Sequence, residues 1–147
     1  MSNFEKIKVL FLCTGNACRS QISEAWLRIM GGKKFDVYSA GLEPHGVNPF
    51  AKAVMKETGY DMRQHRSKHI DVYIGRKQFD YLISVCSDAE KRCPYFPGSG
   101  ERIHWRFEDP AVFEGTDEEK MAVFRETRDL IKKQIKNWLA DSFPNEH

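Results

Sequence analysis

Residues 6–20 read KIKVLFLCTGNACRS, and this stretch decides the fold class. Its apolar run at residues 9–12 predicts a buried strand over residues 6–12, because continuous apolar runs are typical of strands in parallel sheets. Cys13 stands at the carboxyl end of that strand. A helix with apolar residues at helical spacing begins at Arg19 or Ser20. A strand that passes through a short loop into a helix is the first half of a βαβ unit.

The rest of the chain repeats this alternation of helices and strands. Apolar runs predict further strands over residues 35–39, 80–86 and 102–107, the last of them half-buried and near a sheet edge. Helical spacing and cap residues predict helices over residues 19–30, 48–59 and 117–139. The buried face of the first helix is expected to carry Ile22, Ala25, Trp26 and Ile29, and that of the last Met121, Phe124, Ile131, Ile135 and Trp138. This order predicts an α/β fold, a parallel sheet covered on both faces through right-handed crossovers.

The composition fits one small domain without a strong surface charge. A chain of 147 residues with 41% hydrophobic content can bury one core, so we expect a single domain over residues 1–147. The 23 Lys and Arg nearly cancel the 21 Asp and Glu, and a net charge of +2 does not favour nucleic acid or a membrane surface as partner. Since no apolar run reaches the length of a signal segment or a bilayer, we expect a cytoplasmic protein.

The four cysteines predict catalysis or redox chemistry rather than a permanent disulfide framework. Cytoplasmic thiols are kept reduced, which argues against structural disulfides. The second cysteine spacing, Cys86-x6-Cys93, does not fit a zinc module. We therefore expect no metal.

Three reactive residues follow three different predicted strands. Cys13 and Cys86 end the first and third strands, and Asp109 comes shortly after the fourth. In parallel α/β sheets, ligands bind outside the carboxyl ends of the strands. These groups, far apart in the sequence, are therefore expected to share one edge of the sheet.

The loop between the first strand and helix has the form C-x5-R-S, which suits an oxyanion site. A curled loop can point successive amide groups at an anion, next to the positive end of the following helix. We expect the oxyanion to be bound by Thr14, Gly15, Asn16, Ala17, Cys18 and Arg19. The same field favours a thiolate at Cys13, to which the Ser20 hydroxyl is placed to donate a hydrogen bond.

At this point the sequence resembles a known family. The string CTGNACRS is similar to the active-site loop of the low-molecular-weight tyrosine phosphatases and of the thioredoxin-coupled arsenate reductases that share their fold. Later segments resemble the reductase branch: VYSAG at residues 37–41, HGVNP at 45–49, CSDA at 86–89, CP at 93–94 and HWRFEDPA at 104–111. The resemblance covers nearly the whole chain. It implies a four-stranded parallel sheet flanked by helices.

The resemblance also implies a reaction, the reduction of arsenate to arsenite. Cys13 would attack arsenate, Cys86 would then attack the Cys13 sulfur, and Cys93 would finally attack Cys86. Thioredoxin would reduce the remaining Cys86–Cys93 disulfide, and no cofactor is expected. Asp109 is the expected general acid, although Asp-Pro is also a common turn sequence. We expect the protein to act as a monomer.

Two other functions use the same loop. A phosphatase would use Cys13, Arg19 and Asp109 in the same way and keep Cys86 and Cys93 as a regulatory pair. A module that binds oxyanions or senses oxidants without turnover would not need Asp109. Cys18 is interpreted as a small buried apolar residue, or at most as a partner in a side reaction with Cys13.

Two polar segments are interpreted on composition. Residues 63–68 are expected to form a solvated loop rather than a patch that steers the substrate. Residues 87–92 separate Cys86 from Cys93. We expect them to switch between helix and loop, because a disulfide between these cysteines needs their Cα atoms to lie about 4.4 to 6.8 Å apart. His104 is expected to serve packing rather than catalysis.

Some members of the family bind potassium near the loop. Asn16, Glu24 and Ser39 match three of the positions involved, but Lys68 stands where a carboxylate is expected. A lysine ammonium can substitute for the cation, so we predict no dependence on potassium.

Overall fold

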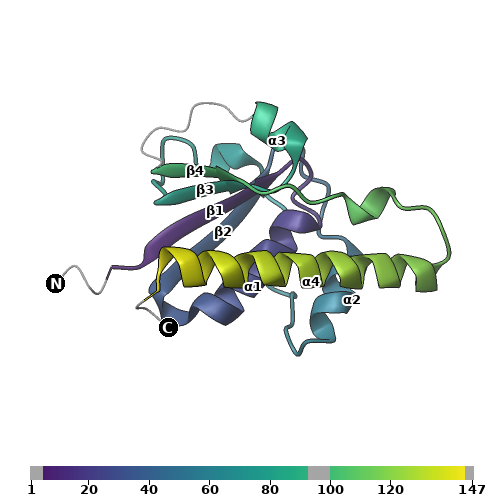
Figure 1. The fold of residues 1–147 in the computed structure, drawn as a ribbon. Coiled ribbons are helices and arrows are strands. Elements are labelled where there is room, and N and C mark those ends of the chain that lie inside the picture. The colour runs from purple at the N-terminus through teal and green to yellow at the C-terminus, as the bar shows by residue number, and fades with distance from the viewer. Residues whose placement is uncertain (1–4, 93–99, 145–147) are drawn as a thin grey trace.

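The computed structural model describes residues 5–92 and 100–144, and its centre is a four-stranded parallel sheet. The strands are β1 (Ile7–Cys13), β2 (Phe35–Gly41), β3 (Tyr81–Ser84) and β4 (Glu101–His104), in the spatial order β2-β1-β3-β4. At their carboxyl ends Cys13 pairs with Gly41, Leu12 with Ser84, and Ser84 with His104. The four strands therefore finish at one edge of the sheet (Figure 1).

Helices cover both faces of this sheet. The α-helices are α1 (Arg19–Gly31), α2 (Pro49–Lys56), α3 (Ser87–Arg92) and α4 (Asp117–Ser142). Short 3-10 helices are η2 (Gly32–Lys34), η3 (Ile70–Val72) and η4 (Pro110–Val112). Helices α1, α2 and α4 lie together on one side of the sheet, and α3 lies on the other side near the ends of β1 and β3 (Figure 1). The expected α/β architecture is confirmed.

Local sequence explains where two of these helices begin. The Asn48 side chain accepts a hydrogen bond from the Phe50 amide, and Pro49 occupies the first turn of α2. A capping box starts α4, because the Thr116 hydroxyl and the Glu119 carboxylate each bond the other residue's backbone amide.

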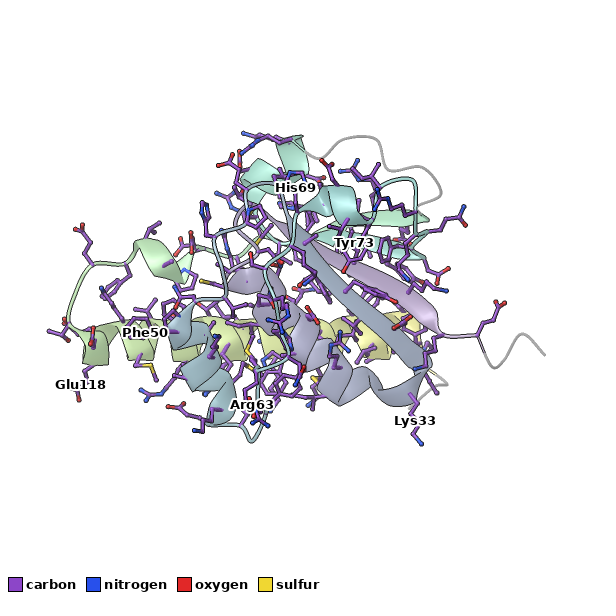
Figure 2. The ribbon with its side chains drawn as sticks, turned by 180° about the vertical axis from the view of Figure 1, so that it is seen from behind. Lys33, Phe50, Arg63, His69, Tyr73 and Glu118 are labelled. Atoms are coloured by element: carbon purple, nitrogen blue, oxygen red, sulfur yellow. The ribbon has the colours of Figure 1, made fainter. Side chains whose placement is uncertain are left out.

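The core is built on β1, whose residues 9–12 have no exposed surface. Below the sheet, Ile22, Ile131 and Ile135 from α1 and α4 are fully buried. On the opposite side, Tyr73 follows η3 and packs edge-on against Tyr38 of β2, with ring centroids 5.5 Å apart. Figure 2 views the sheet from that side and shows the segment with His69 and Tyr73.

Two predicted strands are too long. β4 ends at His104 rather than Phe107, because its pairing partner β3 ends at Ser84 and offers no further register position. β3 itself stops two residues before Cys86, since the chain turns there into α3. Cys86 therefore lies in the connection between β3 and α3, and not on the strand.

Two helical predictions also need correction. α2 ends at Lys56, and the residues up to Gly59 form a turn. Ile29, expected on the buried face of α1, is 44% exposed. Burial along α1 is continuous over residues 20–27, and the helix emerges from the core after Leu27.

Within residues 5–92 and 100–144, no helix has both the length and the apolar character that crossing a membrane requires.

Ile22 and Ile29 offer a matched test of the core, because both lie on α1 and only Ile22 is buried. We expect Ile22→Ala to lower the free energy of unfolding by about 2–5 kcal/mol, through lost burial and a residual cavity. Ile29→Ala should change it by less than about 1 kcal/mol. Urea denaturation followed by circular dichroism measures both values, and equal costs would contradict this packing.

Candidate functional site

The loop between β1 and α1 turns on Asn16. Its φ of 48° is the only positive φ of a non-glycine residue in the described part of the chain. Asparagine tolerates this left-handed conformation better than most residues. Both polar ends of the side chain are used, since Oδ1 accepts from the Lys68 amide at 2.8 Å and Nδ2 donates to Ser20 Oγ at 2.8 Å. The turn is thereby fixed from inside the protein.

The carbonyl groups of the loop are bonded by donors that lie outside it. In a trans peptide the C=O and N–H groups point in opposite directions, so carbonyls held outward leave the amides free to face inward. The pairs are Glu43 N to Thr14 O at 2.8 Å, His45 N to Gly15 O at 3.0 Å, Gln21 Nε2 to Asn16 O at 3.1 Å and Asn48 N to Ala17 O at 3.0 Å. The loop therefore has the form of an anion nest.

Cys13 lies at the base of this nest and is 3% exposed. Its sulfur accepts from the Asn16 amide at 3.2 Å and lies 3.0 Å from Ser20 Oγ. The side-chain Nδ2 of Asn16 already donates to Ser20 Oγ, so the Ser20 hydroxyl proton is free to point at the Cys13 sulfur. Both contacts can stabilise a thiolate.

Arg19 and Asp109 stand together at the mouth of the nest. Arg19 Nη2 lies 3.5 Å from Asp109 Oδ2, and Arg19 Nη1 donates to the Phe107 carbonyl at 3.0 Å. Asp109 also caps η4, since its Oδ1 accepts from the Ala111 amide at 2.9 Å. A cavity of about 380 Å³ opens here, lined among others by Cys13, Arg19 and Asp109. It has room for a tetrahedral oxyanion.

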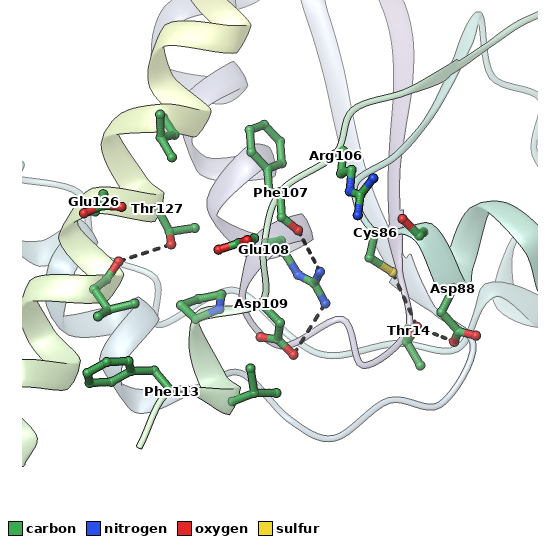
Figure 3. A pocket seen from close by; sticks show the side chains of 16 residues that line it. Thr14, Cys86, Asp88, Arg106, Phe107, Glu108, Asp109, Phe113, Glu126 and Thr127 are labelled. Carbon is green, nitrogen blue, oxygen red and sulfur yellow. Dashed lines mark hydrogen bonds and ion pairs between the residues drawn. The ribbon is translucent and has the colours of Figure 1, made fainter. Parts of the chain in front are cut away.

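Cys86 lies on the other side of the loop. Its sulfur is 3.4 Å from Thr14 Oγ1 and accepts from the Ala89 amide at 3.3 Å. It lines a larger cavity of about 950 Å³ that Thr14, Arg19 and Asp109 also line (Figure 3). These three residues are shared by both cavities. The structure thus brings Cys13, Cys86 and Asp109 around one loop.

The other two cysteines differ in position. Cys18 is 4% exposed, and burial, together with the nearby Asp109 and Cys13, raises the pKa of its thiol to about 12. A thiol with that pKa stays protonated at neutral pH, which supports its interpretation as an inert buried residue. Cys93 lies outside the described residues.

Helix α3 is tied to its surroundings by polar side chains. Asp88 Oδ2 accepts from Thr14 Oγ1 at 2.7 Å and from Arg92 Nη1 at 2.8 Å. The hydrogen bond from Thr14, and secondly the one from Arg92, hold the pKa of the Asp88 carboxyl below its ordinary value. Arg92 also pairs with Glu43 at 2.6 Å. Ala89 is the one buried residue of the helix.

The connector at residues 63–68 supports the loop from below, and its interpretation as a solvated loop is correct only for Arg63, Gln64 and Arg66, which are exposed. His65 is buried, with Nδ1 2.8 Å from Gln21 Oε1 and Nε2 2.8 Å from the Tyr60 hydroxyl. Burial lowers the pKa of His65, so the ring is neutral and joins the two groups. Ser67 Oγ donates to the Gly15 carbonyl at 3.1 Å. Sequence reasoning missed Gln21, His65 and Ser67, because isolated polar residues in a loop or helix carry no pattern.

The residues at the expected cation position are bonded to protein donors. Glu24 accepts from the Ser39 hydroxyl at 2.6 Å and from Arg28 Nη2 at 2.7 Å, and Asn16 Oδ1 accepts from the Lys68 amide. Burial lowers the pKa of the Lys68 ammonium, and the Glu24 charge opposes this shift. Lys68 and Arg28 thus supply positive charge around Glu24.

Comparisons with known proteins show which proteins this chain resembles. A family model described as low molecular weight phosphotyrosine protein phosphatase matches residues 8–146. An arsenate reductase of Halalkalibacterium halodurans is 51% identical over 130 residues, covering 88% of this chain and 93% of the relative. A solved arsenate reductase in its phosphate-binding state superposes with a TM-score of 0.77 at 32% identity, over 92% of this chain and 98% of the other. A thioredoxin-dependent arsenate reductase of Corynebacterium glutamicum gives 0.64 at 29% identity, over 90% of this chain and 61% of the other.

Gly41 provides a test of the nest. A Cβ at this position would lie 2.7 Å from the Thr14 carbonyl oxygen and 2.9 Å from the Asn16 amide nitrogen. We expect Gly41→Ala to displace the loop and weaken phosphate binding at least about ten-fold, since nest amides act only at hydrogen-bond distance. Titration calorimetry with inorganic phosphate measures the affinity. Gly59→Ala is the control, because its positive φ of 89° strains the backbone without contacts within 4 Å. Equal affinity in both variants would refute the displacement.

Potassium binding can be tested by thermal unfolding. A ligand that binds only the folded state raises the melting temperature. Because the Glu24 and Asn16 oxygens are already bonded by protein donors, we expect the same melting temperature in potassium and sodium chloride at equal ionic strength. A higher melting temperature in potassium alone would contradict the prediction.

Proposed function

This chain belongs to the low molecular weight phosphotyrosine protein phosphatase family, and we propose that within it the protein is a thioredoxin-dependent arsenate reductase. The relatives named arsenate reductase, at 42–51% identity, support the substrate. The thioredoxin-dependent neighbour supports the reductant. The thiols that carry out this reaction must be reduced between turnovers, which agrees with the proposed place in the cytoplasm. We expect the protein to act there as a single-domain monomer.

One observation carries the proposal beyond a phosphatase. The Cys86 sulfur lies 3.4 Å from the hydroxyl of Thr14, the residue that follows Cys13 in the oxyanion loop. Hydrolysis of a phosphate ester needs one thiol, whereas reduction of arsenate needs two electrons, which a pair of thiols supplies by forming a disulfide. A second thiol beside the nest is therefore what a reductase requires.

In the first step the Cys13 thiolate attacks arsenic and a sulfur–arsenic bond forms. The Asn16 amide and Ser20 hydroxyl stabilise the thiolate, and the nest amides with Arg19 bind the arsenate oxygens. The oxygen opposite the sulfur leaves as water once it is protonated. Asp109, 3.5 Å from Arg19 at the mouth, is the proton donor.

In the second step the Cys86 thiolate attacks the Cys13 sulfur. The sulfur–arsenic bond breaks with its electron pair on arsenic, which becomes arsenite, and a Cys13–Cys86 disulfide forms. Cys93 then attacks Cys86, which frees the Cys13 thiolate and leaves a Cys86–Cys93 disulfide. Thioredoxin reduces this disulfide by supplying two electrons and two protons.

Replacing each cysteine by serine tests the relay. We expect Cys13→Ser, Cys86→Ser and Cys93→Ser each to abolish multiple-turnover arsenite production, because each removes one sulfur from the sequence of exchanges. The measurement is arsenate-dependent NADPH oxidation coupled through thioredoxin and thioredoxin reductase.

Cys18→Ser is the matched control and should keep the rate within about three-fold, since this thiol is buried and protonated. The protein would be a phosphatase if it hydrolysed a phosphate ester but did not reduce arsenate, and if Cys13→Ser were the only one of these variants to lose the hydrolysis. A parent that binds arsenate without any turnover would be a binding module.

A further inference from the structure

One buried hydroxyl joins the end of the sheet to α3. Ser84, the last residue of β3, is 2% exposed and stands opposite His104 of β4 in the strand register. Its Oγ donates to Glu90 Oε1 of α3 at 2.9 Å and lies 2.8 Å from Nδ1 of His104. Three elements, β3, β4 and α3, are thus connected through one oxygen atom.

This group is not a hydrolase triad, although it contains a serine, a histidine and a carboxylate. In such triads the histidine lies between the other two residues and takes the serine proton. Here Ser84 lies in the middle and donates its proton to Glu90, so the histidine does not activate the hydroxyl. The hydroxyl is also almost fully buried, which keeps a substrate away from it. Its contacts therefore act on the position of α3.

The contact closes the chain around Cys86. The Glu90 amide donates to the Cys86 carbonyl at 3.2 Å, in the first turn of the helix. The Glu90 side chain reaches back to Ser84, two residues before Cys86. Since Ala89 is the one buried residue of α3, apolar packing holds this helix weakly, and a single hydrogen bond to a buried group changes how often it opens.

We propose that Ser84 is a positioning residue for the disulfide relay, which holds α3 in place through Glu90 and so limits how often the helix opens. The inference deepens the proposed function and rests on it, because the attack of Cys93 on Cys86 requires the expected switch of residues 87–92. In that exchange the Cys86–Cys93 bond forms, the Cys13–Cys86 bond breaks, and its electron pair stays on the Cys13 sulfur. A weaker contact at Ser84 increases the open fraction of α3 and speeds this exchange.

Hydrogen–deuterium exchange of the α3 amides tests the contact in the reduced full chain without arsenate. These amides exchange when the helix opens, so their rate follows the open fraction. We expect Ser84→Ala to raise the rate about five-fold or more, through loss of one hydrogen bond to a carboxylate. Ser84→Thr keeps the hydroxyl and should stay within about two-fold of the parent. Unchanged exchange in Ser84→Ala would overturn the proposal.

Further variants separate this contact from other effects. Ser23→Ala removes a similarly buried hydroxyl on α1, bonded to the Arg19 carbonyl, and should leave the exchange of α3 unchanged. Glu90→Ala should raise the exchange at least as much as Ser84→Ala, whereas Glu90→Gln should stay near the parent, because its amide oxygen can still accept the proton. If Glu90→Gln matched Glu90→Ala, the ion pair with Arg102 at 3.5 Å would hold the helix, and the proposal would fail.

A single-turnover assay connects the contact to the reaction. With arsenate and without thioredoxin, rapid alkylation and mass spectrometry follow both disulfides in the full chain. We expect Ser84→Ala to form the Cys86–Cys93 disulfide about three-fold faster or more, with formation of the Cys13–Cys86 disulfide changed by less than about two-fold. An unchanged or slower second disulfide would overturn the role of Ser84 in the relay. If arsenate produced no disulfide in the parent, the proposed function would fail, while the exchange experiment would still decide whether Ser84 holds α3.

Discussion

One backbone constraint supports the whole site, namely that the carbonyl groups between Cys13 and Arg19 point away from the centre of the loop. Each buried carbonyl without a partner would cost about 1–3 kcal/mol, so the loop needs donors on its outer side. Four residues of the loop have them, from Glu43, His45, Asn48 and the Gln21 side chain. The backbone amides of the loop therefore face inward, where they can stabilise a negative charge on the Cys13 sulfur.

The sheet order brings these donors to the loop. β2 pairs with β1 to the last residue, with Gly41 opposite Cys13, so the chain that leaves β2 must run beside the loop. Gly41 leaves space there that a side chain would fill. The connector before η3 then closes the loop from below, since the Lys68 amide and the Ser67 hydroxyl bond Asn16 and Gly15. The parallel pairing of β1 and β2 thus also shapes the loop between β1 and α1.

Helices α3 and α4 are held in different ways. α4 buries six residues against the sheet and α1, and its position is fixed by the hydrophobic core. α3 buries only Ala89 and is otherwise held by exposed polar contacts of Asp88, Glu90 and Arg92. Exposed ion pairs contribute little to stability, so α3 can leave its place at small cost while the core remains intact. The proposed exchange between Cys86 and Cys93 requires such a movement.

The sequence by itself determined the parallel α/β class and the strand-loop-helix unit around Cys13, and it predicted an oxyanion-binding loop there. Apolar periodicity and the C-x5-R-S spacing are local properties of the chain, so they can be recognised before the fold is known. The sequence could not predict the ends of β3 and β4, because they depend on where the partner strand stops, and it could not predict the exposure of Ile29. Only the tertiary structure decided that Gln21, His65 and Ser67 support the loop and that Thr14 lies between Cys86 and Asp88. Hydrogen-bond direction depends on atoms from distant segments meeting within about 3 Å, and no spacing along the chain encodes that.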